Sequence, residues 1–389
     1  MSFSNNQSPD KVYYDITITN LESATTRPPP LYFTETRNIP FIYDPESYLL
    51  SVIRFQLDTP TLPIFTPQIQ PYSPDINATV YSITLSYTEP TTLIEYNQQT
   101  YITFSPQDLE ASHPPAPSTQ PNGLQSNYTG YYYIYSYQYW INLVNKTFTD
   151  CFNALSAQVV AGGNTLPTTY APLLQFDNQA QIAVLIADNA AYNPNLANPI
   201  QIYFNPPLYH LFSSFPAYIV SINGGNLGKN FLIQTYNFSG GSNAYFPAID
   251  TEYVSLQIPQ EYSTISLWNP VTSIVFCSNT LPIVSNQVSA PLLYNNGIVI
   301  QSGGNNANIS QIITDFVADN YLSSIIYLPS AQYRYIEMFG NRPLYTVDIV
   351  VYWKDRYGAL NPFLLSSGSS ATIKFLFTKK ESSNNSKSN

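Results

Sequence analysis

Residues Leu328–Thr378, LPSAQYRYIEMFGNRPLYTVDIVVYWKDRYGALNPFLLSSGSSATIKFLFT, carry the sharpest secondary-structure pattern of this chain. Along Leu344–Trp353 the side chains alternate, so that one face of the segment is aromatic and β-branched and the other is mixed. Asp355–Gly358 then has the composition of a turn and Ser366–Ser370 that of a flexible corner, and Ala371–Phe377 alternates again. The stretch therefore predicts β-strands joined by turns, and it contains no catalytic motif.

The composition of the whole chain favours the same class of structure. Its 389 residues include 34 Tyr and 32 Pro, and only 10% are charged. Tyr, Thr, Ile and Val favour strands, whereas Pro and Asn favour the turns between them. We count about fifteen strand segments, spaced as in β-sandwiches and jelly rolls, with no fixed-period repeat. The sequence thus predicts an all-β, antiparallel jelly-roll fold, with a weakly charged surface of the kind that is buried between subunits.

Charge and cysteine usage exclude several classes of protein. The net charge of -10 and the pI near 4.5 are unsuited to binding phosphate backbones, so we expect no direct contact with nucleic acid. No apolar run is long enough for a membrane span, and the N-terminus lacks the pattern of a signal peptide. Cys151 and Cys277 are accordingly predicted to be free, buried thiols of a protein made inside the cell.

One segment has a helical period instead. Apolar residues recur at helical spacing over about 138–160, and Gly162 and Gly163 follow, which predicts one substantial helix packed against a sheet. The preceding segment is dense in tyrosine and predicts an edge or interface strand, with a carbohydrate-stacking platform as the less favoured alternative. Tyr131, Tyr133 and Tyr135 are therefore candidate interface residues.

No set of residues predicts catalysis, a cofactor site or a metal site. His113 and His210 are the only histidines, and neither has a second His or Cys at ligand spacing. The Gly-x-Ser-x-Gly, Gly-x-Gly-x-x-Gly and P-loop motifs are all missing from the sequence. We therefore predict that the chain is not an enzyme and needs no cofactor.

Two groups of carboxylates raise the alternative of a calcium ion held between subunits. Asp315 and Asp319 lie four residues apart, and Glu35, Asp44 and Glu46 lie close together in predicted loops. Turn and cap hydrogen bonds are the favoured interpretation of both groups.

Four ordered blocks in the C-terminal third resemble a known family. The blocks are Leu267–Ile283, Gln311–Phe316, Tyr327–Gly358 and Asn361–Phe377, and similar blocks in the middle of the chain extend the likeness over about 130–380. They resemble the minor capsid, or penton, proteins of polinton-like viruses, polintons and virophages.

The resemblance implies a jelly-roll protein that forms a homopentamer at the fivefold vertices of an icosahedral virion. Trimers of a double-jelly-roll major capsid protein would surround it, and a host receptor is a further expected partner. The expected divisions are an N-terminal arm (1–11), jelly-roll strands (12–110), an inserted domain with the helix (111–255), closing jelly-roll strands (256–380) and a disordered polar tail (381–389).

Three further candidates for core or interface positions are Trp268, Trp353 and Arg356. Two alternatives to the penton remain open: a major capsid protein of the same class of virus, and a virion module that binds a receptor or glycan. An all-β hydrolase is least favoured, because no nucleophile set is visible.

Overall fold

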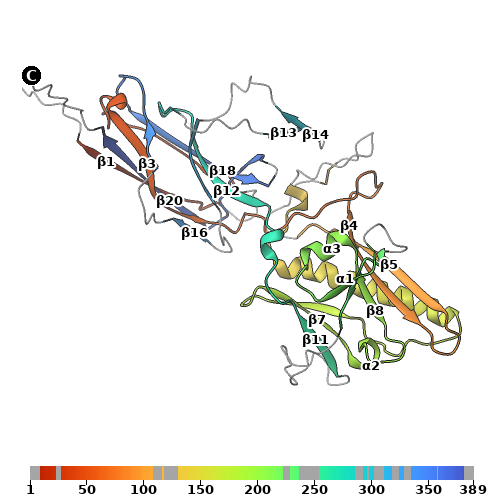
Figure 1. Ribbon diagram of the computed structural model, residues 1–389. Coiled ribbons are helices and arrows are strands. Elements are labelled where there is room, and N and C mark those ends of the chain that lie inside the picture. The colour runs from red at the N-terminus through yellow and green to blue at the C-terminus, as the bar shows by residue number, and fades with distance from the viewer. Residues whose placement is uncertain are drawn as a thin grey trace, which may run out of the picture. The chain divides into compact units, whose positions relative to one another are not determined.

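The structure is a computed structural model whose described residues fall into two compact units (Figure 1). Unit 1 contains the described residues up to Pro63 and from Pro270 onward, and unit 2 those from Ile64 to Asn269. The structure describes residues 9–22, 28–107, 116–117, 130–221, 228–235, 254–284, 292–295, 298–301, 311–317, 324–327, 334–356 and 358–380. The predicted polar tail and most of the predicted arm therefore lie outside the described residues.

Unit 1 contains two larger antiparallel sheets and a β-hairpin. The first sheet has the order β1, β20, β3, β16, with β17 also paired to β3, and these strands are Lys11–Thr19, Ser370–Lys379, Tyr48–Asp58, Ser324–Tyr327 and Ile336–Glu337. The second has the order β15, β12, β18, β19, with β2 also paired to β18, and these strands are Gln311–Val317, Val271–Ser278, Thr346–Asp355, Leu360–Pro362 and Tyr32–Thr36. The hairpin joins β13 (Leu292–Asn295) to β14 (Ile298–Gln301), and a single 3-10 turn, η1 (Pro45–Ser47), precedes β3.

The order of the main strands is that of a jelly roll. If β1, β2, β3, β12, β15, β16, β18 and β20 are numbered one to eight along the chain, the sheets run 1-8-3-6 and 2-7-4-5. Successive strands thus alternate between two four-stranded sheets, except the fourth and fifth, which pair with each other, as in the eight-stranded double Greek key. The sequence-based prediction of an all-β jelly-roll fold is confirmed.

Aromatic side chains join the two sheets of unit 1. The ring centroid of Phe55 on β3 lies 5.0 Å from that of Phe276 on β12 and 4.8 Å from that of Phe316 on β15. At the other end of the sandwich, Phe33 on β2 and Tyr14 on β1 lie edge to face, with centroids 6.5 Å apart. The predicted alternation along β18 is confirmed, because its aromatic and β-branched face is buried: Val347, Ile349, Val351 and Trp353.

The turns predicted near the end of the chain also form. The Gly358 N–H donates to the carbonyl of Asp355 at 3.0 Å, which closes the turn after β18. At the serine-rich corner, the backbone N–H of Ser369 donates to the carbonyl of Ser366 at 3.0 Å. Gly368 in this corner has φ +75°, a conformation that glycine adopts without strain.

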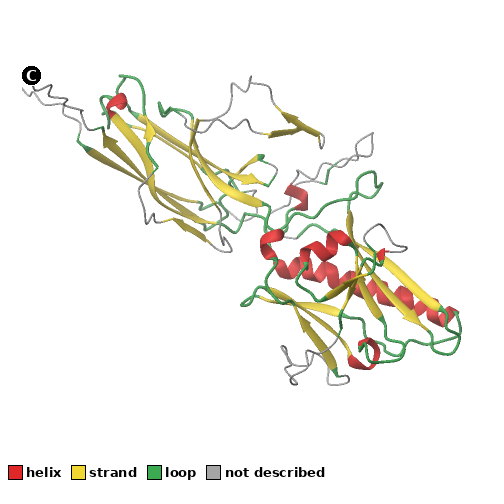
Figure 2. Cartoon of the chain, in the orientation of Figure 1, coloured by secondary structure: helices red, strands yellow, loops and turns green. Residues whose placement is uncertain are grey.

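Unit 2 combines two antiparallel sheets with one long helix (Figures 1 and 2). The larger sheet has the order β5, β4, β8, β10, β9, and its strands are Glu95–Thr103, Ala78–Thr88, Gln201–Phe204, Phe231–Ile233 and Ala217–Ile219. The smaller sheet has the order β11, β7, β6, and its strands are Ser255–Pro259, Ile182–Asp188 and Leu173–Asp177. Short helical segments complete the unit: η2 (Gly130–Tyr132), α2 (Asn189–Tyr192), α3 (Pro206–Leu211) and η4 (Ile265–Leu267).

The long helix α1 (Tyr137–Ala161) forms where the sequence predicts it, and it contacts β4, β5 and β6. Its apolar stripe is buried, and Gly162 and Gly163 follow its last turn. Asn145 fixes the helix to the edge strand β6: its amide donates to the carbonyl of Leu174 at 2.8 Å and accepts from the Leu174 N–H at 2.7 Å.

The division into units differs from the limits expected from sequence. The chain leaves the jelly roll after β3 and returns at β12, so β4 and β5 lie in unit 2, although the sequence placed them among the first jelly-roll strands. The reason is pairing and packing, because β4 pairs with β8, more than a hundred residues later, and β5 lies against α1.

Candidate functional site

The six candidate core or interface residues do not form one site. Trp353 and Arg356 lie in unit 1, whereas Trp268 and the three tyrosines, Tyr131, Tyr133 and Tyr135, lie in unit 2. Trp353 is buried on β18 opposite Ile274 of β12. Arg356 is exposed in the turn that follows β18, and its backbone N–H donates to the carbonyl of Pro270 at 3.0 Å.

Trp268 lies at the centre of an aromatic cluster in unit 2. Its ring is 1% exposed, and its Nε1 donates to the carbonyl of Leu211 at 2.7 Å. Four rings lie with their centroids 5.2–6.4 Å from it: Phe65, Tyr137, Phe176 and Phe212. Trp268 follows η4 and precedes β12, which begins at Val271.

The prediction that the tyrosine-rich segment is an edge strand is wrong. Its described residues form the 3-10 turn η2 and the start of α1. The Tyr131 ring packs against Phe104 with a centroid distance of 5.6 Å, and its hydroxyl donates to Asn77 at 3.0 Å. Tyr131 is therefore a core residue, whereas Tyr133 and Tyr135 are only half-buried and lie edge to face at 6.5 Å. Aromatic packing within unit 2 overrides the strand preference of tyrosine here.

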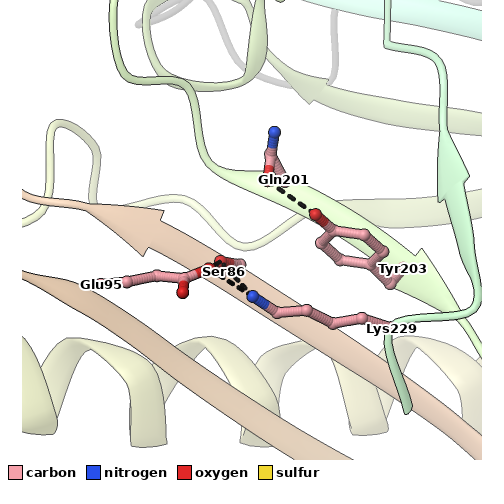
Figure 3. Close-up of polar contacts among 5 residues, drawn as sticks. All are labelled: Ser86, Glu95, Gln201, Tyr203 and Lys229. Carbon is pink, nitrogen blue, oxygen red and sulfur yellow. Dashed lines mark hydrogen bonds and ion pairs between the residues drawn. The ribbon is translucent and has the colours of Figure 1, made fainter. Parts of the chain in front are cut away.

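A polar network that joins buried strand residues to the exposed carboxylate of Glu95 lies on one face of the larger sheet of unit 2 (Figure 3). The opposite face of β4 packs on α1, where the Tyr81 and Trp140 rings meet at 5.4 Å. On the polar face, Ser82, Thr84 and Ser86 are each 0–2% exposed. Polar groups that are buried this deeply require hydrogen-bond partners, and a segment remote in the sequence supplies some of them.

Lys229 enters this network from the segment before β10. Figure 3 shows its ammonium group between Glu95 and Ser86; it pairs with the Glu95 carboxylate and donates to the Ser86 hydroxyl at 3.1 Å. The same group lies 5.5 Å from the centroid of the Tyr203 ring, and the Tyr203 hydroxyl donates to Gln201 at 2.7 Å. The segment is thereby fixed to three strands of the sheet.

The pKa values of this network follow from its contacts. The hydrogen bond from Lys229 lowers the pKa of Glu95 most, against an opposing effect of burial, and the hydrogen bond from Ser86 lowers it further. Burial, followed by the negative charge of Glu95, raises the pKa of Tyr203. At neutral pH the network therefore holds one ion pair and a protonated tyrosine, and it contains no activated nucleophile.

Gly228 allows this segment to approach the sheet. Its φ is +68°, and a Cβ at this position would lie 2.4 Å from Nε2 of Gln99 and 3.2 Å from Oγ1 of Thr84. The Gln99 amide cannot move without losing its 2.9 Å hydrogen bond to the Ser82 hydroxyl.

We expect Gly228→Ala to destabilise unit 2 by more than about 1 kcal/mol, because backbone strain and a steric clash act together. The matched control is Gly163→Ala in the same unit, at φ +81° but with no atom within 4 Å of the added Cβ. Urea unfolding of both variants measures the difference. Equal losses of stability in the two variants would show that the close approach at Gly228 contributes nothing.

Sequence reasoning missed a second network, which lies in unit 1 around Asp348 of β18. This carboxylate is 1% exposed and accepts hydrogen bonds from the Ser278 hydroxyl, the Thr280 hydroxyl at 2.6 Å, and the backbone N–H groups of Asn279 and Thr280, each at 2.9 Å. Burial alone would raise the pKa of Asp348, but these hydrogen bonds outweigh it and lower the pKa. The signal in the sequence was an aspartate in the middle of an otherwise apolar strand.

The carboxylates considered for calcium have other partners. Glu35 accepts a hydrogen bond from Tyr14 and pairs with Arg37, with 3.1 Å between Oε1 and Nε. Asp44 accepts from the Ser47 hydroxyl, and Asp315 pairs with Arg334 at 3.3 Å.

Asp44 thus makes a hydrogen bond within the turn η1, as the favoured interpretation expected, whereas Glu35 and Asp315 form ion pairs instead of turn or cap hydrogen bonds. Within the part of the chain that the structure describes, no three His, Cys, Asp or Glu side chains gather as metal ligands would. Asp319 and His113 lie outside the described residues.

Both cysteines are free and buried, as predicted. Burial raises the pKa of Cys151 to about 11 and that of Cys277 to about 12, so both thiols stay protonated at neutral pH. His210 lies in the last turn of α3. Among the helices that the structure describes, none has the length and apolar character needed to cross a membrane.

Known proteins match this chain over most of its length. A family model described as Sputnik minor capsid protein V18/19 matches residues 12–379. Structural protein V19 of Sputnik virophage is 33% identical over 212 residues, which are 53% of this chain and 93% of that protein. Uncharacterized protein V18 of the same virophage is 35% identical over 157 residues, which are 40% of this chain and 90% of that protein.

Two solved structures have a similar fold. A chain in the cryo-EM structure of the Sputnik virophage has a TM-score of 0.76 and 30% identity, over 96% of this chain and 98% of that chain. The crystal structure of the mavirus penton protein has a TM-score of 0.60 and 15% identity, over 95% of this chain and 99% of that chain, and this likeness concerns the fold alone.

The family match extends from the first strand of the jelly roll to the last, and thus includes both units. The family model is described as a minor capsid protein and V19 as a structural protein, so the chain is a structural capsid protein and not an enzyme. The polar network around Lys229 joins three strands of unit 2, and the buried network around Asp348 joins β18 to the residues that follow β12. The chain belongs to the Sputnik minor capsid protein V18/19 family.

Proposed function

We propose that this minor capsid protein is a penton, which forms the homopentameric capsomer at the fivefold vertices of an icosahedral virion. The observation that carries the proposal is the combination of one jelly roll with one inserted unit. The fold of the mavirus penton protein has the same extent, since it matches 95% of this chain. Trimers of a major capsid protein would surround the vertex, and a host receptor would contact the exposed part of the penton.

The same combination argues against the alternative of a double-jelly-roll major capsid protein. Unit 1 supplies a complete set of eight jelly-roll strands. In the described part of unit 2, the larger sheet has the order β5, β4, β8, β10, β9 and packs on a 25-residue helix. This arrangement is not a second jelly roll.

Two opposite sides of the jelly roll are suited to a ring of subunits. One side consists of β1 and β2 and exposes Tyr13 and Tyr32; the other consists of β15 and β16 and exposes Val317 and Ile326. A closed fivefold ring needs a heterologous interface, in which two different surfaces meet. We propose that the first side of one copy contacts the second side of the next.

Light scattering of the purified full-length chain tests the pentamer. We expect a mass of about 218 kDa, five times the 43.7 kDa of one chain. Ile326→Lys, at a residue that is 61% exposed on the edge strand β16, should shift the mass toward the monomer, because a charge would be buried at the interface. The matched control is Ile219→Lys in unit 2, where the side chain is 63% exposed.

Other outcomes would favour the alternatives. A mass near 131 kDa, three times that of one chain, would favour a trimeric capsomer. A stable monomer that binds glycans would favour a receptor-binding module. Pentamers that Ile326→Lys leaves intact would keep the penton and reject the proposed interface.

A further inference from the structure

The hairpin that joins β4 to β5 presents two adjacent aliphatic side chains at its turn. Leu93 is 73% exposed and Ile94 is 50% exposed. Thr91 and Thr92 beside them are exposed and uncharged. Two exposed apolar residues in sequence on a short turn are unusual, because turns are normally built from polar residues and glycine.

The turn itself is rigidly built, and it does not use these two side chains. The Glu89 carboxylate is buried beneath it and accepts hydrogen bonds from the N–H groups of Thr91, at 2.9 Å, and Thr92, and from the Thr92 hydroxyl at 2.8 Å. Two backbone hydrogen bonds of 2.9 Å close the turn: the Leu93 N–H donates to the Glu89 carbonyl, and the Glu89 N–H donates to the Ile94 carbonyl. The side chains of Leu93 and Ile94 are thus held outward without closing the turn.

Leu93 also adopts a backbone conformation that leucine disfavours. Its φ is +56°, in the left-handed region where glycine and asparagine occur readily and most other residues do not. A polar asparagine at this position would relieve the strain and improve the solubility of the turn. Because Leu93 is 73% exposed, its side chain adds little packing to the unit, and such strain occurs at sites that contact a ligand.

The C-terminal turn of α1 adds a third aliphatic side chain to this end of unit 2. Tyr96, two residues beyond Ile94, lies against Gly162, because a Cβ on that glycine would be 2.1 Å from the tyrosine hydroxyl oxygen. Val160, two residues before Gly162, is 59% exposed. We call Leu93, Ile94 and Val160 the apolar tip.

The hairpin residues 88–95 and the last turn of α1 include no basic side chain. The Glu89 carboxylate is engaged by the turn, and the Glu95 carboxylate is bound by Lys229 and Ser86. Electrostatic attraction to an anionic surface therefore contributes nothing at the tip.

The apolar tip is also far from the points at which the chain enters and leaves unit 2. Those points lie at the other end of α1, where Tyr137 contacts Trp268 with a ring-centroid distance of 5.7 Å. A helix of 25 residues is about 37 Å long. The tip therefore lies at the free end of the inserted unit.

We propose that the apolar tip inserts into the interface of a zwitterionic lipid bilayer. A stable protein–protein contact needs about 800 Å² from each partner and roughly 20–30 residues, and three aliphatic side chains among polar residues do not provide it. A lipid surface needs no complementary shape: it takes up aliphatic side chains in proportion to their apolar area. Because the turn already holds Leu93 outward, binding to the bilayer loses little conformational entropy.

A single apolar tip binds weakly, and repetition makes the binding effective. This step rests on the proposed pentamer, which would present five tips to the same membrane. Linked weak sites raise the apparent affinity by about 10²–10⁴ when the geometry allows them to bind together. The proposal therefore adds a membrane-contacting role to the inserted unit.

Flotation of the full-length protein with phosphatidylcholine vesicles tests the proposal. We expect the wild type to float with the vesicles at both low and high salt, because burial and not charge drives the contact. The double variant Leu93→Asn, Ile94→Thr should float about tenfold less, since it loses the apolar area of the turn. The matched control is Leu196→Asn, at a loop leucine of the same unit that is 39% exposed, and it should float like the wild type.

Thermal unfolding excludes misfolding as the cause. Asparagine tolerates the left-handed conformation, so the double variant should unfold at the same temperature as the wild type or above it. Two outcomes would overturn the lipid site alone: equal flotation of the wild type and the double variant, or a protein that is pentameric by light scattering and does not float.

The other two outcomes concern a protein that is monomeric by light scattering. If its flotation requires Leu93, the pentamer is refuted and the lipid site is kept. If it does not float, both proposals are contradicted.

Discussion

Trp268→Ala should destabilise unit 2 by about 3–5 kcal/mol, the usual effect of removing a buried tryptophan from a core. The ring is 1% exposed and lies among Phe65, Tyr137, Phe176 and Phe212, so its removal leaves a cavity between rings that cannot close over it. Hydrogen exchange should show lost protection in unit 2, while the peptides of unit 1 keep theirs, because the ring belongs to the core of unit 2.

Two variants serve as controls for this result. Trp268→Phe keeps an aromatic ring that fills part of the cavity, so it should destabilise unit 2 clearly less than Trp268→Ala. The Leu211 carbonyl retains its 2.6 Å hydrogen bond from the Thr264 hydroxyl in both variants. Trp353→Ala removes the buried tryptophan of β18 and should instead affect unit 1. If Trp268→Ala left the protection of unit 2 unchanged, the aromatic cluster would not be the core of that unit.

Asp348→Asn should destabilise unit 1 by about 3 kcal/mol, because several donors would then face an amide nitrogen in place of a carboxylate oxygen. The substitution hardly changes the volume of the side chain, so cavity formation does not contribute. Asp315→Asn is the matched control on the edge strand β15, where the ion pair with Arg334 is exposed and should be worth less than about 1 kcal/mol. Urea unfolding measures both values.

The same residue predicts a dependence on pH. The pKa of Asp348 is lowered in the folded state, so its contribution is fully present above the pKa of about 3.9 for an unfolded aspartate. It is lost as the pH falls through the lower pKa of the folded state. The difference in stability between the wild type and Asp348→Asn should therefore shrink at acid pH. A difference that stayed constant down to that range would contradict the assignment of a bound carboxylate.

The regular elements could be predicted because their patterns are local. The alternation along β18 and the helical period of α1 each place apolar side chains on one face, and tertiary structure agreed with both. The prediction of a strand in the tyrosine-rich segment failed because the contacts there are not local. The Tyr131 hydroxyl donates to Asn77 and its ring packs on Phe104, and both residues are far away in the sequence. Strand preference there was overridden by packing.

The boundaries of the units and the buried networks depend on contacts that no local pattern records. β4 alternates like any strand, and only its pairing with β8 places it in unit 2. Lys229 and Glu95 are 134 residues apart in the chain, and each in isolation resembles an ordinary surface charge. Only the network around Asp348 could have been anticipated from the local sequence, because a carboxylate within an apolar strand requires a hydrogen-bond partner.

The entry and exit of unit 2 lie side by side, with the rings of Phe65 and Trp268 only 5.9 Å apart at their centroids. We expect that the described part of unit 2 can therefore be exchanged by recombination without lengthening the connection between β3 and β12. We expect related chains to keep the jelly roll while the unit between the two junctions varies. We also expect the same two junctions to tolerate the insertion of a reporter domain.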